Sequence, residues 1–172
     1  MPSSAVIDDL SRSPPISSIG TVWQLFTDRV MGGVSNGTMV RELVAGRPVI
    51  RMRGDVRLEH NGGFVQIALD LALAGKLVDG SSWSGIELEI LGNNEQYNIH
   101  LRTADLIRPW QSYRQSFLAD GRWRTVRLLF RDFKPYRTDK ALDTTRLRRI
   151  GLVAIGRAFS ADLSLGGLRY FT

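Results

Sequence analysis

The chain has 172 residues, 43% hydrophobic and 23% charged, which suffices for one domain with a buried core and excludes wholesale disorder. It contains no cysteine, so disulfides, cysteine-ligated metal sites and thiolate nucleophiles are excluded. The net charge of +6 is uneven: residues 1–100 carry 8 basic and 11 acidic side chains, whereas residues 101–172 carry 15 and 6.

The first 18 residues are polar and contain Ser-Pro-Pro at 13–15, which predicts a flexible N-terminal arm before a single domain over residues 19–172. This segment lacks the basic and apolar regions of a signal peptide. No apolar run in the chain is long enough to span a bilayer. We therefore expect a cytoplasmic protein without a transmembrane segment.

From residue 19 onward, apolar residues alternate with polar ones and turn signals recur at the spacing of about 8–12 residues that is typical of a sandwich or barrel. The pattern predicts strands around residues 50–52, 65–71, 126–130 and 163–165. The continuous apolar run over 150–155 predicts a central strand covered on both faces. Short helical turns are expected near 73–77 and 143–147. The fold class predicted is an all-β sandwich.

The clearest strands are Ile86–Ile90 and Tyr97–Arg102, each with apolar residues on one face and polar residues on the other. The two asparagines at 93–94 tolerate positive φ and favour a tight turn. A two-residue loop there would pair Leu88 with Ile99 and Glu87 with His100, matching apolar and polar faces along both strands. The sequence therefore predicts a β-hairpin over residues 86–101.

Catalytic chemistry is poorly represented in the sequence. The two histidines, His60 and His100, are too few for a histidine-based metal site, and no phosphate-binding loop is present, so we expect no metal and no cofactor. Gly33–Gly37 matches the G-x-S-x-G motif around Ser35. A nucleophile elbow requires a helix after the serine, and the residues that follow are typical of a strand. We therefore predict a protein that is not an enzyme.

Two segments have a composition suited to binding: residues 28–35 combine an acid, a base and two glycines, and residues 101–114 combine arginines with a tryptophan and a tyrosine. Arginine beside aromatic rings offers stacking together with bidentate hydrogen bonds. An alternative interpretation is a buried arginine–aspartate network with the tryptophan in the core. The candidate binding surface consists of Asp28, Arg29, Asn61, Arg102, Arg108, Trp110, Tyr113 and Arg114.

Five blocks, in order between Val22 and Tyr170, resemble the NADH:ubiquinone oxidoreductase (complex I) intermediate-associated protein family of the thirty-kilodalton type. The blocks are DRVMGGVS (28–35), NGGF (61–64), HLRTAD (100–105), RPWQSYR (108–114) and RIGLVAIGRAF (149–159). The resemblance implies a galactose-binding-domain-like jelly roll and a non-enzymatic, chaperone-like role in assembling a respiratory complex. The chain is similar to a bacterial, single-domain member.

The sequence is therefore compatible with two functions. The first is a protein-binding assembly factor whose partner is a respiratory-complex subunit. The alternative is a carbohydrate-binding module that uses an arginine and aromatic concave face. Nucleic acid is not favoured as a partner, because the arginines are scattered at strand-like spacing and do not form one basic block.

Overall fold

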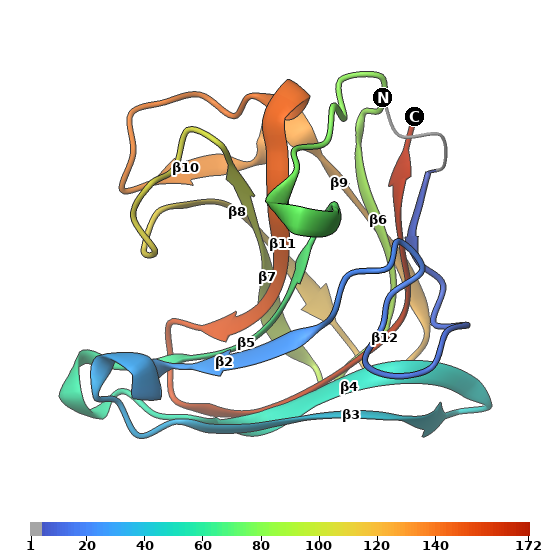
Figure 1. Ribbon diagram of the computed structural model, residues 1–172. Helices are drawn as coiled ribbons and strands as arrows, with labels where there is room; N and C mark the ends of the chain where they lie inside the picture. Colours follow the sequence, from blue (N-terminus) through green and yellow to red (C-terminus); the bar gives the residue numbers. More distant parts are fainter. Residues whose placement is uncertain (1–4) are drawn as a thin grey trace.

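The computed structural model describes residues 5–172, which form two antiparallel six-stranded sheets joined by loops and short 3₁₀ turns (Figure 1). We call them the β12 sheet, in the order β3-β4-β12-β6-β9 with β1 beside β12, and the β11 sheet, in the order β10-β8-β7-β11-β5-β2. The β12 sheet contains β1 (Val6–Asp8), β3 (Asn36–Val44), β4 (Arg47–Val56), β6 (Gly85–Leu91), β9 (Arg124–Leu129) and β12 (Phe159–Phe171). The β11 sheet contains β2 (Gln24–Thr27), β5 (Phe64–Asp70), β7 (Glu95–Thr103), β8 (Ser112–Ala119), β10 (Lys134–Tyr136) and β11 (Leu147–Ile155).

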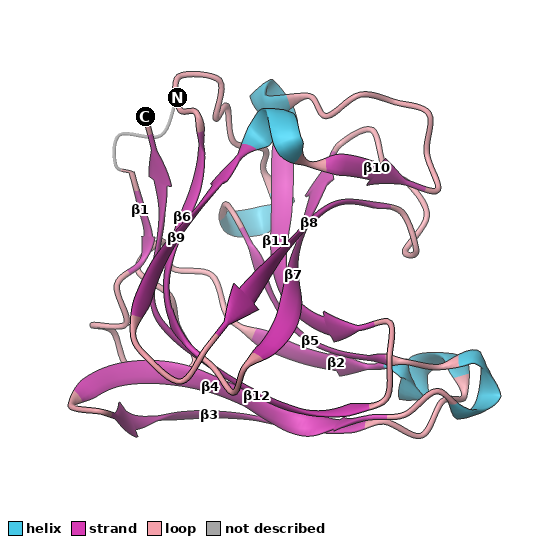
Figure 2. Ribbon diagram, turned by 180° about the vertical axis from the view of Figure 1, so that it is seen from behind, coloured by secondary structure: helices cyan, strands magenta, loops and turns pink. Residues whose placement is uncertain are grey.

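The helical content of the described residues is limited to short 3₁₀ turns in the loops (Figure 2). These are η1 (Asp28–Met31), η2 (Glu59–Asn61), η3 (Leu73–Gly75), η4 (Phe130–Asp132) and η5 (Thr144–Arg146). The turns η3 and η5 confirm the helical turns expected near residues 73–77 and 143–147. Over residues 5–172, no helix is long and apolar enough to cross a membrane.

The two sheets share one core, to which each contributes the apolar face of its strands. Leu88 and Leu163 of the β12 sheet and Ile99 and Leu152 of the β11 sheet are all fully buried in the same cluster. Burying each such side chain contributes about 1.5–3 kcal/mol, so the alternation of apolar residues determines which face of each strand turns inward. The prediction of an all-β jelly-roll sandwich is confirmed.

The prediction of a hairpin over residues 86–101 is wrong, although both strands exist. Strand β6 pairs with β12 and β9, and β7 pairs with β11 and β8, so the loop between them crosses from one sheet to the other. The apolar faces were predicted correctly, because Leu88 and Ile99 both point into the core. They enter the same core from opposite sheets and do not lie side by side. Glu87 accordingly bonds to Arg127 at 2.8 Å and is not paired with His100.

The N-terminal segment packs against the domain from residue 5 onward, which differs from the flexible arm expected over residues 1–18. Strand β1 pairs with β12, and Ile7 and Leu10 belong to the core. Trp23 donates from Nε1 to the buried Asp8 carboxylate at 2.7 Å. The first four residues of the predicted arm lie outside the described residues. The two ends of the described chain lie near each other in Figure 1 because β1 and β12 are neighbours.

Strand β11 is central, as predicted from its apolar run, and lies between β7 and β5 with residues 150–154 buried. Figure 1 shows the β11 sheet bending along these strands, so that β8 and β10 flank one side and β2 the other. The face bordered in this way turns away from β6 and β12. We call it the concave face.

Candidate functional site

Rows of side chains cross the concave face, because directly paired residues of antiparallel strands point to the same side of a sheet. One row consists of Lys134, Arg114, His100, Gly151, Ala68 and Gln24. A second row consists of Ser116, Asn98, Val153, Gln66 and Phe26. Along these two rows, basic side chains lie at the β8–β10 edge, and amide and apolar side chains lie toward β5 and β2.

Arg114 is fixed in orientation on this face. Its guanidinium lies 3.5 Å from the centre of the Tyr136 ring, and its Nε donates to the Ser112 hydroxyl at 2.8 Å. Its two terminal nitrogens have no hydrogen-bond partner among the described residues. Partial burial lowers the pKa of Arg114, and nearby Arg137 lowers it further, while Tyr136 acts in the opposite direction.

His100 lies beside Arg114 and is 9% exposed. Its Nε2 is buried and finds no partner in the part of the chain that is described. Burial, and secondarily the positive charge of Arg114, lower the pKa of His100 to about 3. The imidazole is therefore neutral at pH 7 and contributes no positive charge to the face.

Arg102 holds the loop that connects β7 to β8. Its Nη1 donates to the carbonyls of Arg108 at 2.9 Å and Gln111 at 2.5 Å, and its Nη2 donates to the carbonyl of Leu106 at 3.2 Å. A lysine could not replace Arg102 here, because its ammonium group lacks the planar, forked guanidinium that donates to these separate carbonyls. We conclude that Arg102 is mainly a structural residue that sets the shape of this loop.

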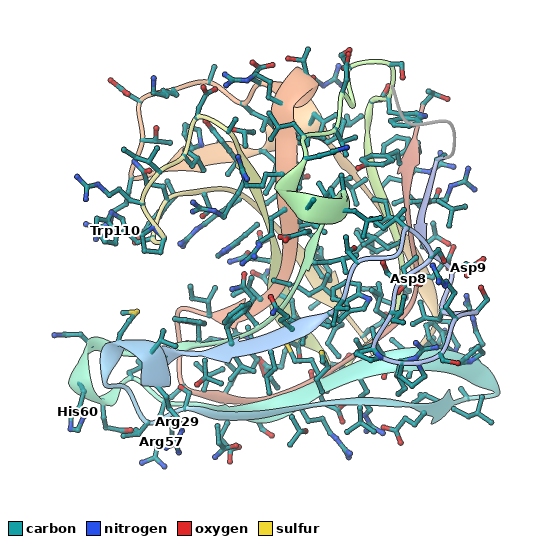
Figure 3. All side chains as sticks on the ribbon, viewed as in Figure 1. Asp8, Asp9, Arg29, Arg57, His60 and Trp110 are labelled. Atoms are coloured by element: carbon teal, nitrogen blue, oxygen red, sulfur yellow. The ribbon has the colours of Figure 1, made fainter. Side chains whose placement is uncertain are left out.

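The same loop exposes two apolar side chains, Ile107 at 81% and Trp110 at 55%. Arg108 lies 5.9 Å from the Trp110 ring. Figure 3 shows Trp110 at the end of the loop on the β8–β10 side of the concave face. The interpretation of Trp110 as a core residue is therefore wrong.

Further across the concave face, Arg149 bonds to Asp70 at 2.8 Å and lies 5.7 Å from the Phe26 ring. Burial, followed by the positive charges of Arg149 and Arg148, lowers the pKa of Arg102. Arg149 and Arg148 thus lie close enough to Arg102 to repel it. Of these three arginines, only Arg149 has a carboxylate within 4.0 Å in the described part of the chain.

Asp28 is fully buried and does not belong to a surface. Its carboxylate accepts hydrogen bonds from the backbone amides of Ser35 at 3.0 Å, Gly63 at 2.6 Å and Phe64 at 3.3 Å, and from the Ser35 hydroxyl. Burial acts to raise the pKa of Asp28, but these hydrogen bonds outweigh it and the pKa lies below its ordinary value. Asp28 ties η1 to the start of β5.

The G-x-S-x-G segment serves this same cluster. The Ser35 hydroxyl donates to Asp28 and accepts from the Arg57 amide at 2.8 Å, and β3 follows directly. Gly33 is required because a Cβ at that position would overlap the Asp28 side chain. Ser35 makes no hydrogen bond to a histidine within residues 5–172, so the segment has the geometry of a structural turn.

Of the remaining predicted residues, Tyr113 is fully buried and points into the core, where its hydroxyl donates to the Ala141 carbonyl at 3.2 Å. Its ring is not available for stacking with a ligand. Arg29 and Asn61 are exposed in η1 and η2. Figure 3 shows Arg29 and His60 beyond the ends of β2 and β5, well separated from Trp110.

The structure therefore brings together Arg102, Arg108, Trp110 and Arg114 but not Asp28, Arg29 or Asn61. Several residues of the concave face were missed in the sequence: Phe26, Gln66, Asn98, Lys134 and Tyr136. The alternation along 97–102 did place Asn98, His100 and Arg102 on one face. Which strands lie beside that face is decided by the sheet order, which no local pattern reveals. The described residues contain no group of three or more histidines and carboxylates placed to hold a metal ion.

Comparison with solved structures supports the jelly-roll fold. A family 11 carbohydrate-binding module from Clostridium thermocellum, in complex with a β-1,3-1,4-mixed-linked tetrasaccharide, aligns with a TM-score of 0.75 at 11% identity, covering 98% of this chain and 95% of that one. A family 30 carbohydrate-binding module aligns with a TM-score of 0.66 at 13% identity, covering 96% and 88%. At these identities the likeness concerns the fold alone.

No curated protein matches the chain in sequence. The family model described as complex I intermediate-associated protein 30 (CIA30) does match, over residues 15–165. This range contains all five of the sequence blocks and every strand of the β11 sheet. The chain therefore belongs to the complex I intermediate-associated protein 30 family.

Proposed function

We propose that the protein is a non-catalytic binding module that holds a polypeptide partner on its concave face during assembly of a respiratory complex. Family membership supports the assembly role. The bacterial origin and cytoplasmic location expected from the sequence, and a respiratory-complex subunit as the partner, are part of this proposal.

The observation that carries the proposal is a difference between the two sheets in how basic side chains are paired with carboxylates. On the outer face of the β12 sheet, Arg51 bonds to Asp162 at 2.7 Å and to Glu42 at 3.2 Å. On the concave face, Arg114 and Lys134 have no carboxylate within 4.0 Å in the described chain. Lys134 is exposed, but Arg114 is partly buried, and an unpaired cation that is partly buried costs stability. A surface that keeps such a group is suited to an anionic partner.

Carbohydrate binding is the second candidate, favoured by the exposed Trp110 ring on a jelly-roll concave face. The other aromatic rings of the face favour it less. A guanidinium lies over each of them, Arg114 over Tyr136 and Arg149 over Phe26. A sugar that stacks on a ring would compete with these arginines for the ring face.

Site-specific photo-crosslinking in the native host tests the proposal. A photoreactive residue at Ser116, exposed on the concave face, is expected to capture a respiratory-complex subunit. The same residue at Thr38, exposed on β3 of the other sheet, is the matched control and is expected to capture none. Equal capture at both positions, or no respiratory-complex subunit at Ser116, would contradict the proposal.

Affinity electrophoresis in mixed-linkage β-glucan tests the second candidate. The proposal of a protein partner predicts no retardation of the protein by the glucan. Retardation that disappears in Trp110→Ala would instead support carbohydrate binding.

A further inference from the structure

Arg114 is held in a way that leaves one defined edge of its guanidinium available. The flat face is occupied by Tyr136 at 3.5 Å, and Nε is engaged by Ser112 at 2.8 Å. The terminal nitrogens Nη1 and Nη2 remain without a partner among residues 5–172. This edge presents two parallel N–H donors, which match the two oxygens of a carboxylate.

The surroundings of Arg114 form a pocket of about 280 Å³ on the outer side of β7, β8 and β10. Its lining residues are Asn98, Arg114, Gln115, Ser116, Asp132 and Lys134. Two of these side chains are positive and one is negative, and three offer neutral amide or hydroxyl groups. The pocket is therefore suited to receive one anionic side chain beside polar backbone groups.

No carboxylate of the described residues lies within 4.0 Å of the Arg114 guanidinium, although Asp132 lines the same pocket. Lys134 in β10 and Arg137, the residue after β10, add positive charge near Arg114. His100 on β7 is neutral, because burial lowers its pKa to about 3. An arriving carboxylate would relieve the repulsion and replace water at an arginine that is already oriented, so little side-chain entropy is lost on binding.

We infer that this pocket binds a glutamate or aspartate side chain from an acidic segment of the partner polypeptide, with Nη1 and Nη2 of Arg114 donating to the two carboxylate oxygens. The inference rests on the proposed function and specifies its partner chemistry. It makes Arg114 a recognition residue, in contrast to Arg102, whose guanidinium is occupied by carbonyls of its own chain.

The choice of a polypeptide over an acidic sugar follows from the rest of the surface. The exposed Ile107 and Trp110 lie in the loop that leads into β8, and Figure 3 shows Trp110 on the β8–β10 side of the concave face. An aliphatic side chain such as Ile107 packs well against apolar peptide side chains. A segment that carries both carboxylates and apolar residues matches this combination.

The test is binding of the whole protein to immobilised poly-L-glutamate at low ionic strength, measured for wild type, Arg114→Gln, Arg114→Lys and Arg122→Gln. Arg122 is exposed, has no carboxylate within 4.0 Å among residues 5–172 and is the control with the same loss of charge. We expect Arg114→Gln to weaken binding roughly 5- to 30-fold, the equivalent of one charge-assisted bidentate pair. Arg114→Lys keeps the charge but not the fork and is expected to weaken binding similarly, whereas Arg122→Gln is expected to change it less than about twofold.

Equal weakening by Arg114→Gln and Arg122→Gln would overturn the inference, because it would show attraction by net charge alone. Competition by polygalacturonate or inorganic phosphate that is stronger than competition by free poly-L-glutamate would overturn the choice of a polypeptide. Thermal melts of each variant verify that the fold is intact. If Ser116 still captures a respiratory-complex subunit while polyglutamate binding is insensitive to Arg114, this inference fails and the proposed function stands.

Discussion

At Asp28 a carboxylate with the chemistry of a binding residue is wholly used by its own chain. Three backbone amides and one hydroxyl donate to it, and the loops after β2 and before β5 are joined there. Arg114 lies in the other segment whose composition suggested binding. The contacts that orient it leave its two terminal nitrogens without a partner among the described residues. The difference between these residues lies in how many of their hydrogen-bonding groups are satisfied internally.

Replacement Asp28→Asn is expected to lower the free energy of unfolding by about 2–3 kcal/mol at pH 7, because an amide cannot accept from all of these donors. The folded pKa of Asp28 lies below its ordinary value of 3.8, so this stabilisation is present above pH 3.8 and is lost as the pH falls through the folded pKa. Urea unfolding at pH 7 and pH 3 measures both effects. The exposed Asp55→Asn serves as control, and a similar loss in both variants would contradict the prediction.

His100 makes stability depend on pH in the range where histidine normally titrates. The unfolded chain takes up a proton near the ordinary pKa of 6.5, while the folded chain does so only near pH 3. The unfolded state therefore binds more protons below pH 6.5, and stability falls as the pH drops from 6.5 to 3. Between pH 7 and pH 5 we expect wild type to lose about 1–2 kcal/mol more than His100→Gln does.

Chemical denaturation at pH 7, 6 and 5 provides this comparison. His60 is exposed, so His60→Gln is expected to retain the pH dependence of wild type. A wild-type protein whose stability at pH 5 falls no more than that of His100→Gln would show that His100 titrates normally.

At the scale of elements, the N-terminal segment is an integral strand. Its turn residues and prolines suggest a flexible arm. However, Ile7 and Leu10 are buried in the core, and β1 pairs with β12. The average composition of such a segment does not reveal that two of its apolar residues, Ile7 and Leu10, are buried. Pairing of β1 with the last strand brings together residues at opposite ends of the chain, which no local signal encodes.

Deletion of residues 1–10 is expected to cost roughly 3–6 kcal/mol, the sum for two buried aliphatic side chains, and it also removes Asp8, the acceptor of the Trp23 Nε1 hydrogen bond. Guanidinium unfolding of the truncated protein measures the loss. Deletion of residues 1–4, which leaves β1 intact, is the control. Unchanged stability after removal of residues 1–10 would restore the interpretation of a free arm.

At the scale of the molecule, both sheets and both ends of the described chain contribute to one core. The basic second half of the sequence does not form a separate basic body, because its strands are distributed over both sheets. A difference in charge instead appears between faces: Arg51 on the outer face of the β12 sheet pairs with two carboxylates, whereas Arg114 on the concave face has none within 4.0 Å among the described residues, although Arg149 there pairs with Asp70. The distribution of basic residues along the sequence therefore did not predict how they are distributed over the faces of the molecule.

A shared core predicts that the protein unfolds as one cooperative unit. Urea unfolding curves from far-ultraviolet circular dichroism and from tryptophan fluorescence are expected to coincide, since Trp23 lies in the core formed by both sheets. Two separate transitions, or midpoints that differ between the two signals, would show that the sheets are independent.

The sequence by itself determined the fold class, the family, the inward face of each main strand and the central place of residues 150–155. These depend on local alternation and on burial, which are properties of each strand alone. Only the tertiary structure decided that β6 and β7 belong to different sheets, that Asp28 and Tyr113 are buried, and that the terminal nitrogens of Arg114 have no partner among the described residues. Apolar faces can match equally well beside each other or across a core, and only the path of the whole chain selects between the two.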